Sequence, residues 1–224
     1  QRYEATNLDL TAEYYFENGG MASLAGFYKQ IENPIYTFST EERNVENPFG
    51  EGRSFQTVFR TQQRNANDGT IRGLEASYQQ PFTYLPAPFN GFGIVSNATF
   101  ADSEVDVPER EGELPFFEQA DLTYNFIPYF QKQGLEVRVA WNFRSDFLGD
   151  LGDIPAEDEY VDDRTTVDIN ASYKMNEMPG QPKVMLQVEN LTNEPEVYYA
   201  GQEDHLAYHY LSGRTVSLGL SMGF

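Results

Sequence analysis

The final eleven residues, Arg214-Thr-Val-Ser-Leu-Gly-Leu-Ser-Met-Gly-Phe224, are the stretch that decides the fold. Apolar side chains alternate there with small polar residues or glycine. A period of two is typical of a β-strand with one apolar and one polar face. The final aromatic residue would sit where a barrel's girdle meets the membrane surface. The apolar positions of this barrel-terminal signature are Val216, Leu218, Leu220, Met222 and Phe224.

The same alternation recurs upstream, and the sequence therefore predicts about nine antiparallel strands in all. The upstream segments are residues 8–16, 21–38, 74–79, 94–101, 120–126, 135–144, 166–173 and 184–189. Asn18-Gly19-Gly20 predicts a tight turn with positive φ angles after the first strand. Residues 55–64 also resemble a strand, and we interpret them as an excursion or as an extension of the next strand.

Short and long connections alternate along the chain. The predicted short turns are residues 17–21, 80–91, 127–134 and 174–183, and the long loops are residues 39–69, 102–118, 145–163 and 191–213. In an antiparallel sheet all short turns then fall at one end and all long loops at the other, which is typical of outer-membrane barrels. An odd number of antiparallel strands cannot close without one parallel pair, so we expect a part of a larger barrel.

Composition excludes several classes of protein. The chain has no Cys, so disulfides and thiolate chemistry are excluded. A net charge of −20 argues against a nucleic-acid partner. No apolar run reaches the length of about 18 residues that a transmembrane helix needs. The N-terminus lacks the pattern of a signal peptide, and we expect a processed chain or a fragment. Hydrolase motifs are also missing, so we expect no enzyme and no cofactor.

Several stretches together resemble the C-terminal barrel portion of TonB-dependent outer-membrane receptors, most closely the Xanthomonas–Caulobacter type. They follow one another in family order over nearly the whole chain. They are residues 7–16, 26–31 and 67–75, Leu85-Pro86, residues 91–94, 97–100, 141–145 and 188–194, and Gly213-Arg-Thr with the terminal strand.

This resemblance implies an all-β, up-and-down transmembrane barrel of 22 strands, of which residues 1–224 supply about nine. It implies a Gram-negative outer membrane, with extracellular long loops and periplasmic short turns. Implied partners are membrane lipid, an N-terminal plug domain, TonB acting through a TonB box, and the barrel-assembly machinery acting on the terminal strand. The plug, TonB box and signal peptide lie outside this chain. The implied function is TonB-energised uptake of a scarce small-molecule nutrient, with a saccharide slightly favoured over a ferric siderophore.

Candidate ligand contacts come from the last long loop and from the inner wall. Aromatic side chains near hydroxyl groups suit stacking on sugar rings or on aryl groups of siderophores. The loop candidates are Tyr198, Tyr199, His205, Tyr208, His209 and Tyr210, and the wall candidates are Arg138, Asn142 and Arg144. Self-packing of the loop and ordinary solvation of a wet inner wall remain the simpler interpretations. The acidic loop at 145–163 lacks a calcium-loop motif, so we expect no metal site.

Two alternatives stay open at this point. A passive porin or small outer-membrane barrel is favoured if the intact chain has no plug. A soluble carbohydrate-binding β-protein is favoured if the apolar faces turn inward and the chain is soluble without detergent.

Overall fold

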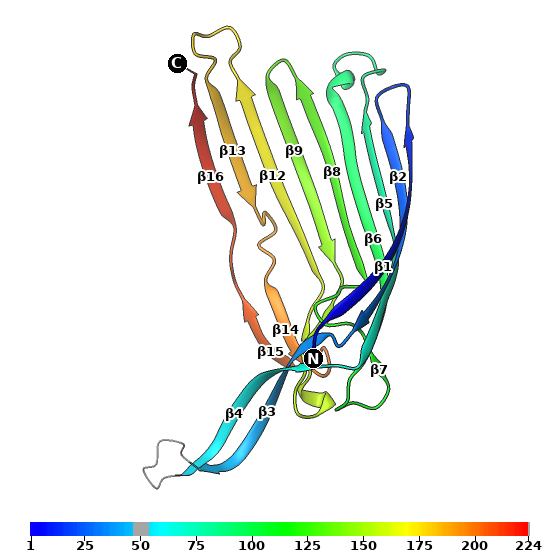
Figure 1. Ribbon diagram of the computed structural model, residues 1–224. Coiled ribbons are helices and arrows are strands. Elements are labelled where there is room, and N and C mark those ends of the chain that lie inside the picture. The colour runs from blue at the N-terminus through cyan, green and yellow to red at the C-terminus, as the bar shows by residue number, and fades with distance from the viewer. Residues whose placement is uncertain (47–53, 224) are drawn as a thin grey trace.

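The computed structural model describes residues 1–46 and 54–223. Within them, nine long strands form one curved antiparallel sheet in the order β1-β2-β5-β6-β8-β9-β12-β13-β16 (Figure 1). These wall strands are β1 (Glu4–Tyr15), β2 (Met21–Glu32), β5 (Asp68–Pro81), β6 (Phe92–Asp106), β8 (Leu122–Lys132), β9 (Leu135–Arg144), β12 (Arg164–Lys174), β13 (Lys183–Glu189) and β16 (Thr215–Ser221). The predicted number of strands is confirmed. The sheet ends at β1 and β16, which are not paired with each other, as expected for part of a barrel.

The short connections all lie at one end of the sheet and the long loops at the other (Figure 1). The shortest, between β8 and β9, is a turn at Gln133 and Gly134, both with positive φ. The prediction of a turn over 127–134 was therefore too long. Pro128 lies inside β8 and pairs with Ile94, although proline lacks the N–H group that a strand residue normally contributes. The short 3-10 helix η1 (Phe89–Gly91) lies in the β5–β6 connection.

The first hairpin shows why its two glycines are needed. Gly19 has a φ of +83°, which matches the predicted turn conformation. Gly20 does not have a positive φ, so its assignment as a second left-handed residue was wrong. A Cβ atom on Gly20 would instead collide with the side chain of Gln80 on β5. The second glycine thus makes room for a neighbouring strand.

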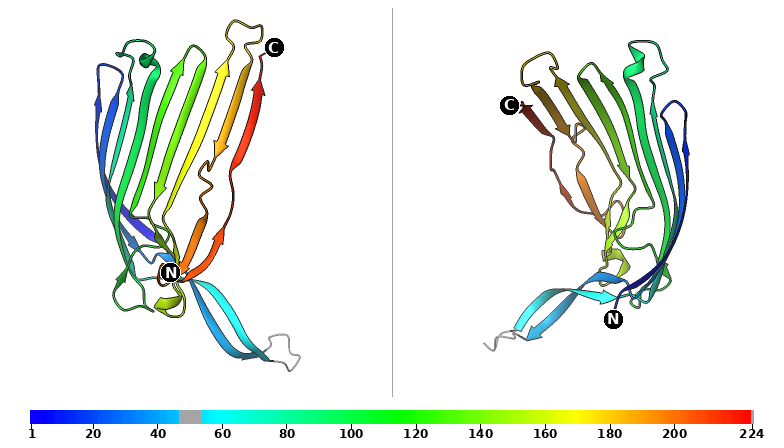
Figure 2. Two further views of the ribbon diagram at one scale, coloured as in Figure 1. Left: turned by 180° about the vertical axis from the view of Figure 1, so that it is seen from behind. Right: turned by 45° about the horizontal axis from the view of Figure 1, so that its top comes forward.

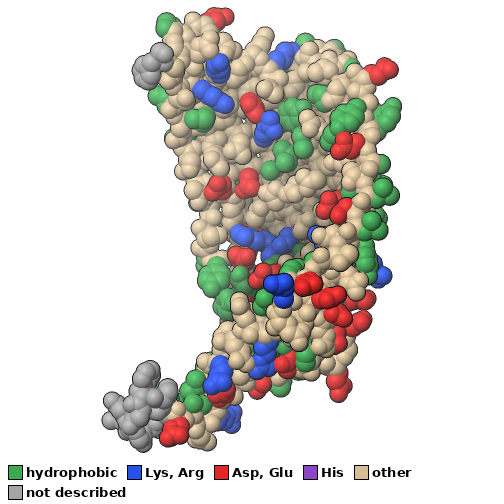
Figure 3. All heavy atoms as spheres, in the orientation of Figure 1, with side chains coloured by type: hydrophobic (Ala, Val, Ile, Leu, Met, Phe, Trp, Pro, Cys, Tyr) green, Lys and Arg blue, Asp and Glu red, His purple; other side chains and the backbone are tan. Residues whose placement is uncertain are grey.

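The strand register separates the side chains into two faces. The predicted wall candidate Arg138 shares one face with Glu75, Asn170 and Glu189, because each lies opposite a residue of the same alternation on the next strand. Figure 3 looks onto this concave face, where charged side chains lie across the sheet. The other face carries large exposed hydrophobic side chains such as Leu218, which is 80% exposed. An apolar outer face and a polar inner face are the pattern of a membrane barrel wall.

This arrangement predicts different effects for arginine on the two faces of β16. Leu218→Arg is expected to lower the stability of the folded barrel by about 2–4 kcal/mol if residue 218 lies near the middle of the bilayer. Ser217→Arg, on the inner face of the same strand, is expected to cost much less. Folding of the full-length receptor into lipid, followed by heat-modifiable electrophoretic mobility, measures both. Equal losses would mean that β16 has no lipid-facing side.

The long loops contain strands of their own, of which the sequence predicted only the strand character of residues 55–64. β3 (Ile35–Glu46) and β4 (Ser54–Asn65) form a separate hairpin that projects beyond the wall (Figures 1 and 2). The predicted strand 21–38 is thus two strands, and residues 55–64 are an excursion, as one interpretation held. A four-stranded sheet contains β10 (Phe147–Asp150), β11 (Glu159–Val161), β14 (Glu196–Ala200) and β15 (Leu206–Tyr210). β7 (Glu113–Leu114) pairs with β6, and the 3-10 helix η2 (Pro155–Glu157) precedes β11.

The hydrophobic core of the described residues lies under these loops and not on the open sheet. We call residues 33–46, 54–67, 107–118, 145–163 and 191–213 the loop cap. Its buried cluster contains Tyr36, Phe38, Ala66, Val105, Val107, Leu148 and Leu151, of which Val105 comes from the wall strand β6. Phe38 and Leu151 form a parallel bridge, so the β3–β4 hairpin is attached to segment 145–163. The loops therefore pack as a folded unit.

No helix in the part of the chain that the structure describes has the length and apolar character to cross a membrane.

Candidate functional site

Glu109 and Arg110, two adjacent residues of segment 107–118, connect this segment to the β3–β4 hairpin and to segment 145–163. The Arg110 guanidinium donates a hydrogen bond of 2.5 Å from Nη2 to Oδ1 of Asp158 and another of 2.8 Å to the carbonyl of Gly152. Both charged side chains of this ion pair are about 5% exposed or less. Glu109 accepts hydrogen bonds from Tyr36 and, at 2.6 Å, from Arg64, both on the β3–β4 hairpin. We call these contacts of Glu109 and Arg110 the clamp.

Three predicted tyrosines of the last loop form one aromatic cluster. Tyr198 on β14 lies opposite Tyr208 on β15, and their ring centroids are 4.5 Å apart in a stacked arrangement. Tyr210 meets both rings edge-on, at 5.7 Å and 5.5 Å. The Tyr208 hydroxyl donates a hydrogen bond of 2.6 Å to Glu159. The structure thus brings together three residues that the sequence nominated.

Tyr199 belongs to a different group. Its ring stacks on Tyr160 with a centroid distance of 5.2 Å and an interplanar angle of 4°. Its hydroxyl donates a hydrogen bond of 3.2 Å to Asp146. The two rings line a cavity of about 520 Å³ with Gly201, Gln202, Glu203 and Asp204. Tyr160 could not be predicted from the sequence, because the three-residue strand β11 is too short to show an alternation.

The two predicted histidines do not converge on one site. His205 lies in the turn before β15, with its Nε2 atom 3.8 Å from a carboxylate oxygen of Asp204. His209 lies within β15 opposite Val197. Across residues 1–46 and 54–223, no three His, Cys, Asp or Glu side chains are grouped so that they could hold a metal ion.

The wall candidates divide along β9. Arg138 pairs with Glu136, at 2.7 Å between Nε and Oε1, and lies over the ring of Tyr129. Asn142 donates a hydrogen bond of 2.9 Å to Asp168 on β12. Arg144 lies six residue steps along the strand from Arg138, or about 20 Å. Arg138 therefore belongs to another part of the wall.

Asn142 and Arg144 line a pocket of about 410 Å³ at the loop end of the inner wall. Its remaining lining residues are Thr123, Asn125, Phe143, Arg164, Thr166 and Glu196. Arg164 is the register partner of Arg144, and its Nη1 atom lies 3.8 Å from Glu196. The buried Nε atom of Arg164 has no hydrogen-bond partner among the described residues. The alternation of the predicted strand 166–173, extended by two residues toward the N-terminus, places Arg164 on the inner face. No sequence pattern marks Glu196.

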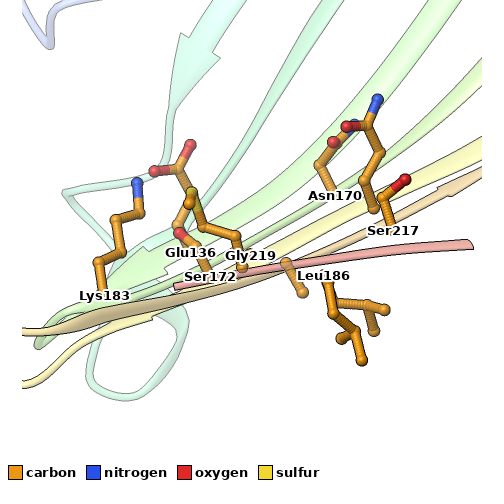
Figure 4. A pocket seen from close by; sticks show the side chains of 11 residues that line it. Glu136, Asn170, Ser172, Lys183, Leu186, Ser217 and Gly219 are labelled. Carbon is orange, nitrogen blue, oxygen red and sulfur yellow. The ribbon is translucent and has the colours of Figure 1, made fainter. Parts of the chain in front are cut away.

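A further pocket of about 340 Å³ lies on the inner wall near the short turns. In Figure 4, Glu136, Ser172 and Lys183 extend from the same side of the sheet as Asn170 and Ser217, whereas Leu186 extends from the opposite side. Gly219 lies between the two groups and contributes no side chain (Figure 4). This close view shows the division into a polar face and an apolar face directly.

The loop tyrosines have pKa values that predict sensitivity to alkaline pH. Burial, and then the nearby charge of Asp146, raise the pKa of Tyr199 above its ordinary value near 10. Burial, and then the hydrogen bond to Glu159, raise the pKa of Tyr208. Unfolded tyrosines release their protons near pH 10, below the folded pKa, so the stability contribution present below pH 10 is lost as the pH rises further.

We therefore expect the loop cap to open above about pH 10, with Tyr199 and Tyr208 ionising later than exposed tyrosines. The ultraviolet absorbance of tyrosinate, compared between the wild type and Tyr208→Phe, measures this. Tyr84→Phe is the matched control, because Tyr84 is 60% exposed in a short connection. Ionisation of Tyr208 near pH 10, the ordinary value for tyrosine, would contradict the expectation.

The curved sheet, its two unlike faces and its sorted loops define a class of protein: the wall of a transmembrane β-barrel that is larger than this chain. A family model narrows this further. The model for the β-barrel of TonB-dependent receptor-like proteins matches residues 2–193. The chain belongs to this family, whose barrels lie in the outer membrane, and the predicted family is confirmed.

Solved structures agree with this fold at low sequence identity. The unliganded ferric citrate transporter FecA superposes with a TM-score of 0.69 at 11% identity, over 98% of this chain and 31% of that one. The siderophore receptor PirA from Acinetobacter baumannii gives 0.63 at 16% identity, over 99% and 32%. The FrpB iron transporter from Neisseria meningitidis gives 0.60 at 15% identity, over 97% and 30%. The chain thus spans under a third of each of these structures. Curated proteins gave no match.

Proposed function

We propose that this chain is the C-terminal wall and loop cap of a receptor that imports a scarce nutrient through energy supplied by TonB. The observation that carries the proposal is the division of the nine-strand wall into an apolar outer face and a polar inner face, with a folded loop cap at one end. The long loops would be extracellular and would capture the ligand. The short turns would be periplasmic.

The inner wall needs a partner that fills the lumen, because an empty barrel of this kind would leak. An N-terminal plug of the same receptor is the proposed occupant, and TonB would displace it through the receptor's N-terminal part. The face with Glu136, Asn170 and Lys183 offers both charges and amide groups to such a domain. Outer-membrane lipid would cover the opposite face. The edge strand β16 would be the part that the barrel-assembly machinery binds; Phe224 of the predicted signature lies outside the described residues.

The proposed ligand-capture residues are the tyrosine cluster of Tyr198, Tyr208 and Tyr210, with Asn142 and Arg144 at the pocket below. Glu196, which lines the pocket, is the register partner of Tyr210 in the cluster, and this pairing supports treating cluster and pocket as one site. The slight preference for a saccharide has no support from the similar solved structures, which are of a ferric citrate transporter, an iron transporter and a siderophore receptor. The proposal therefore specifies a scarce nutrient and no saccharide preference.

Uptake by cells that carry the full-length receptor tests this function. A panel of labelled ferric chelates and oligosaccharides at nanomolar concentration is compared in the parent strain, in a receptor deletion and in a strain without TonB. We expect at least one compound whose uptake is lost in both mutants. Uptake that survives the removal of TonB would instead indicate a passive pore.

A further inference from the structure

The negative charge of this protein is concentrated in three of its loops. Segment 107–118 contains four acidic residues and one basic residue, segment 145–163 contains eight acidic and no basic residues, and segment 191–213 contains four acidic and no basic residues. These segments carry a net charge of −15 of the chain's −20. They lie at the same end of the sheet (Figure 1). Whatever reaches the receptor from that side meets this field first.

The few basic side chains in the loop cap do not cancel this field at its surface. Arg110 is buried against Asp158, and Arg64 is paired with Glu109. The exposed Arg43 and Arg60 pair with Glu41 and Glu42 of their own β3–β4 hairpin. Within the described residues, no Lys or Arg forms an ion pair with Glu203 or Asp204. A concave surface lined by charge of one sign raises the local concentration and the association rate of ligands of the opposite sign by about 10- to 1,000-fold.

The cavity beside Tyr160 and Tyr199 combines this charge with aromatic walls. Its volume is about 520 Å³, and Gly201, Gln202, Glu203 and Asp204 complete its lining. The hydrogen bond from Tyr199 to Asp146 and the stacking of the two rings hold the aromatic wall in place. The backbone of Gly201 is fixed as well, because its N–H donates a 2.8 Å hydrogen bond to the carbonyl of Asp158. The cavity is therefore preformed.

Proteins bind organic cations with aromatic side chains that lie beside carboxylates. The face of a tyrosine ring attracts an ammonium group through the ring quadrupole, and the carboxylates add direct attraction. We infer that the loop surface selects small molecules that carry an ammonium group, and that the cavity lined by Tyr160, Tyr199, Glu203 and Asp204 binds that group. This rests on the proposed function, because it names the ligand class that the loops would capture.

Three probe ligands of nearly equal shape distinguish the effect of ligand charge from that of ligand size on binding to the full-length receptor. Choline carries a quaternary ammonium group, 3,3-dimethylbutan-1-ol replaces the nitrogen by carbon, and 3,3-dimethylbutanoate carries a negative charge. Binding to purified receptor in detergent, measured by ligand-observed nuclear magnetic resonance, needs neither TonB nor transport. We expect choline to bind about tenfold more tightly than the neutral alcohol and the carboxylate not to bind, with the choline affinity falling as salt increases.

Variants of the receptor test whether the proposed cavity is the place where choline binds. Glu203→Gln with Asp204→Asn is expected to weaken choline binding about fivefold or more, and Tyr160→Leu to abolish the preference over the alcohol. Glu111→Gln with Glu113→Gln removes the same charge elsewhere on the loops and is expected to leave most of the affinity. Equal binding of choline and the alcohol, or equal losses in the two double variants, would overturn the inference. Loss of TonB-dependent uptake with choline binding intact would instead count against the proposed function alone.

Discussion

Replacement of Arg110 by Ala is expected to open the loop cap and to lower its stability by about 3–5 kcal/mol. Breaking a buried ion pair is costly because the remaining charge, here Asp158, stays buried without its partner. Asp158 also accepts a hydrogen bond from the backbone N–H of Gly152, and its carbonyl accepts one from Gly201. The change therefore affects two segments far apart in the sequence.

Amide hydrogen exchange in the full-length receptor measures this opening. The N–H groups of Gly152 and Gly201 are expected to exchange roughly two to four orders of magnitude faster in Arg110→Ala than in the wild type. Arg43→Ala is the control, because Arg43 and Glu41 form an exposed pair of the kind that contributes little. The double variant Arg110→Met, Asp158→Leu should recover protection, since apolar side chains of similar volume often replace a buried ion pair. Unchanged exchange in Arg110→Ala would show that the clamp does not hold the loops.

Leu148→Ala is expected to cost about 2–5 kcal/mol of loop-cap stability. Leu148 is fully buried and packs in the cluster that contains Tyr36 and Phe38 of the β3–β4 hairpin. A cavity at this position would loosen the hairpin as well as segment 145–163. Ile154→Ala is the matched control, because Ile154 lies in the same segment and is 52% exposed.

Protease cleavage of the hairpin in intact cells reports this loosening. The Leu148 variant is expected to be cut within the β3–β4 hairpin much faster than the wild type, and the Ile154 variant at nearly the wild-type rate. Equal cleavage of the two variants would mean that the hairpin does not depend on the buried cluster. The wall strands should remain resistant in both variants, because Val105 is the only residue of this buried cluster that a wall strand contributes.

The wall was predictable because its signal is local. Each wall strand alternates apolar and polar residues over several positions, and Val216, Leu218 and Leu220 show this most clearly. The odd number of strands and the sorted loops followed from the same pattern. Only the ends of strands were misplaced, as at Pro128, where pairing with β6 outweighs the missing N–H group.

The loop cap was not predictable because its contacts join residues far apart in the sequence. Arg110 and Asp158 are 48 residues apart, and Tyr36 and Glu109 are 73 apart. β10 and β11 have four and three residues, too few to show a period. The same reason explains the candidate site. The sequence nominated the tyrosines by composition, but it did not show that Tyr199 would separate from Tyr198 and stack on Tyr160.

The central claim is that the nine-strand sheet is a membrane wall with its apolar face toward lipid. Spin labels placed one at a time at residues 216–220 of the full-length receptor in lipid vesicles test it most directly. Collision with oxygen, which concentrates in lipid, and with a water-soluble nickel chelate should alternate along the strand. We expect labels at 216, 218 and 220 to meet oxygen, and labels at 217 and 219 to meet the chelate more often. Uniform exposure to the chelate, or the opposite alternation, would contradict the account.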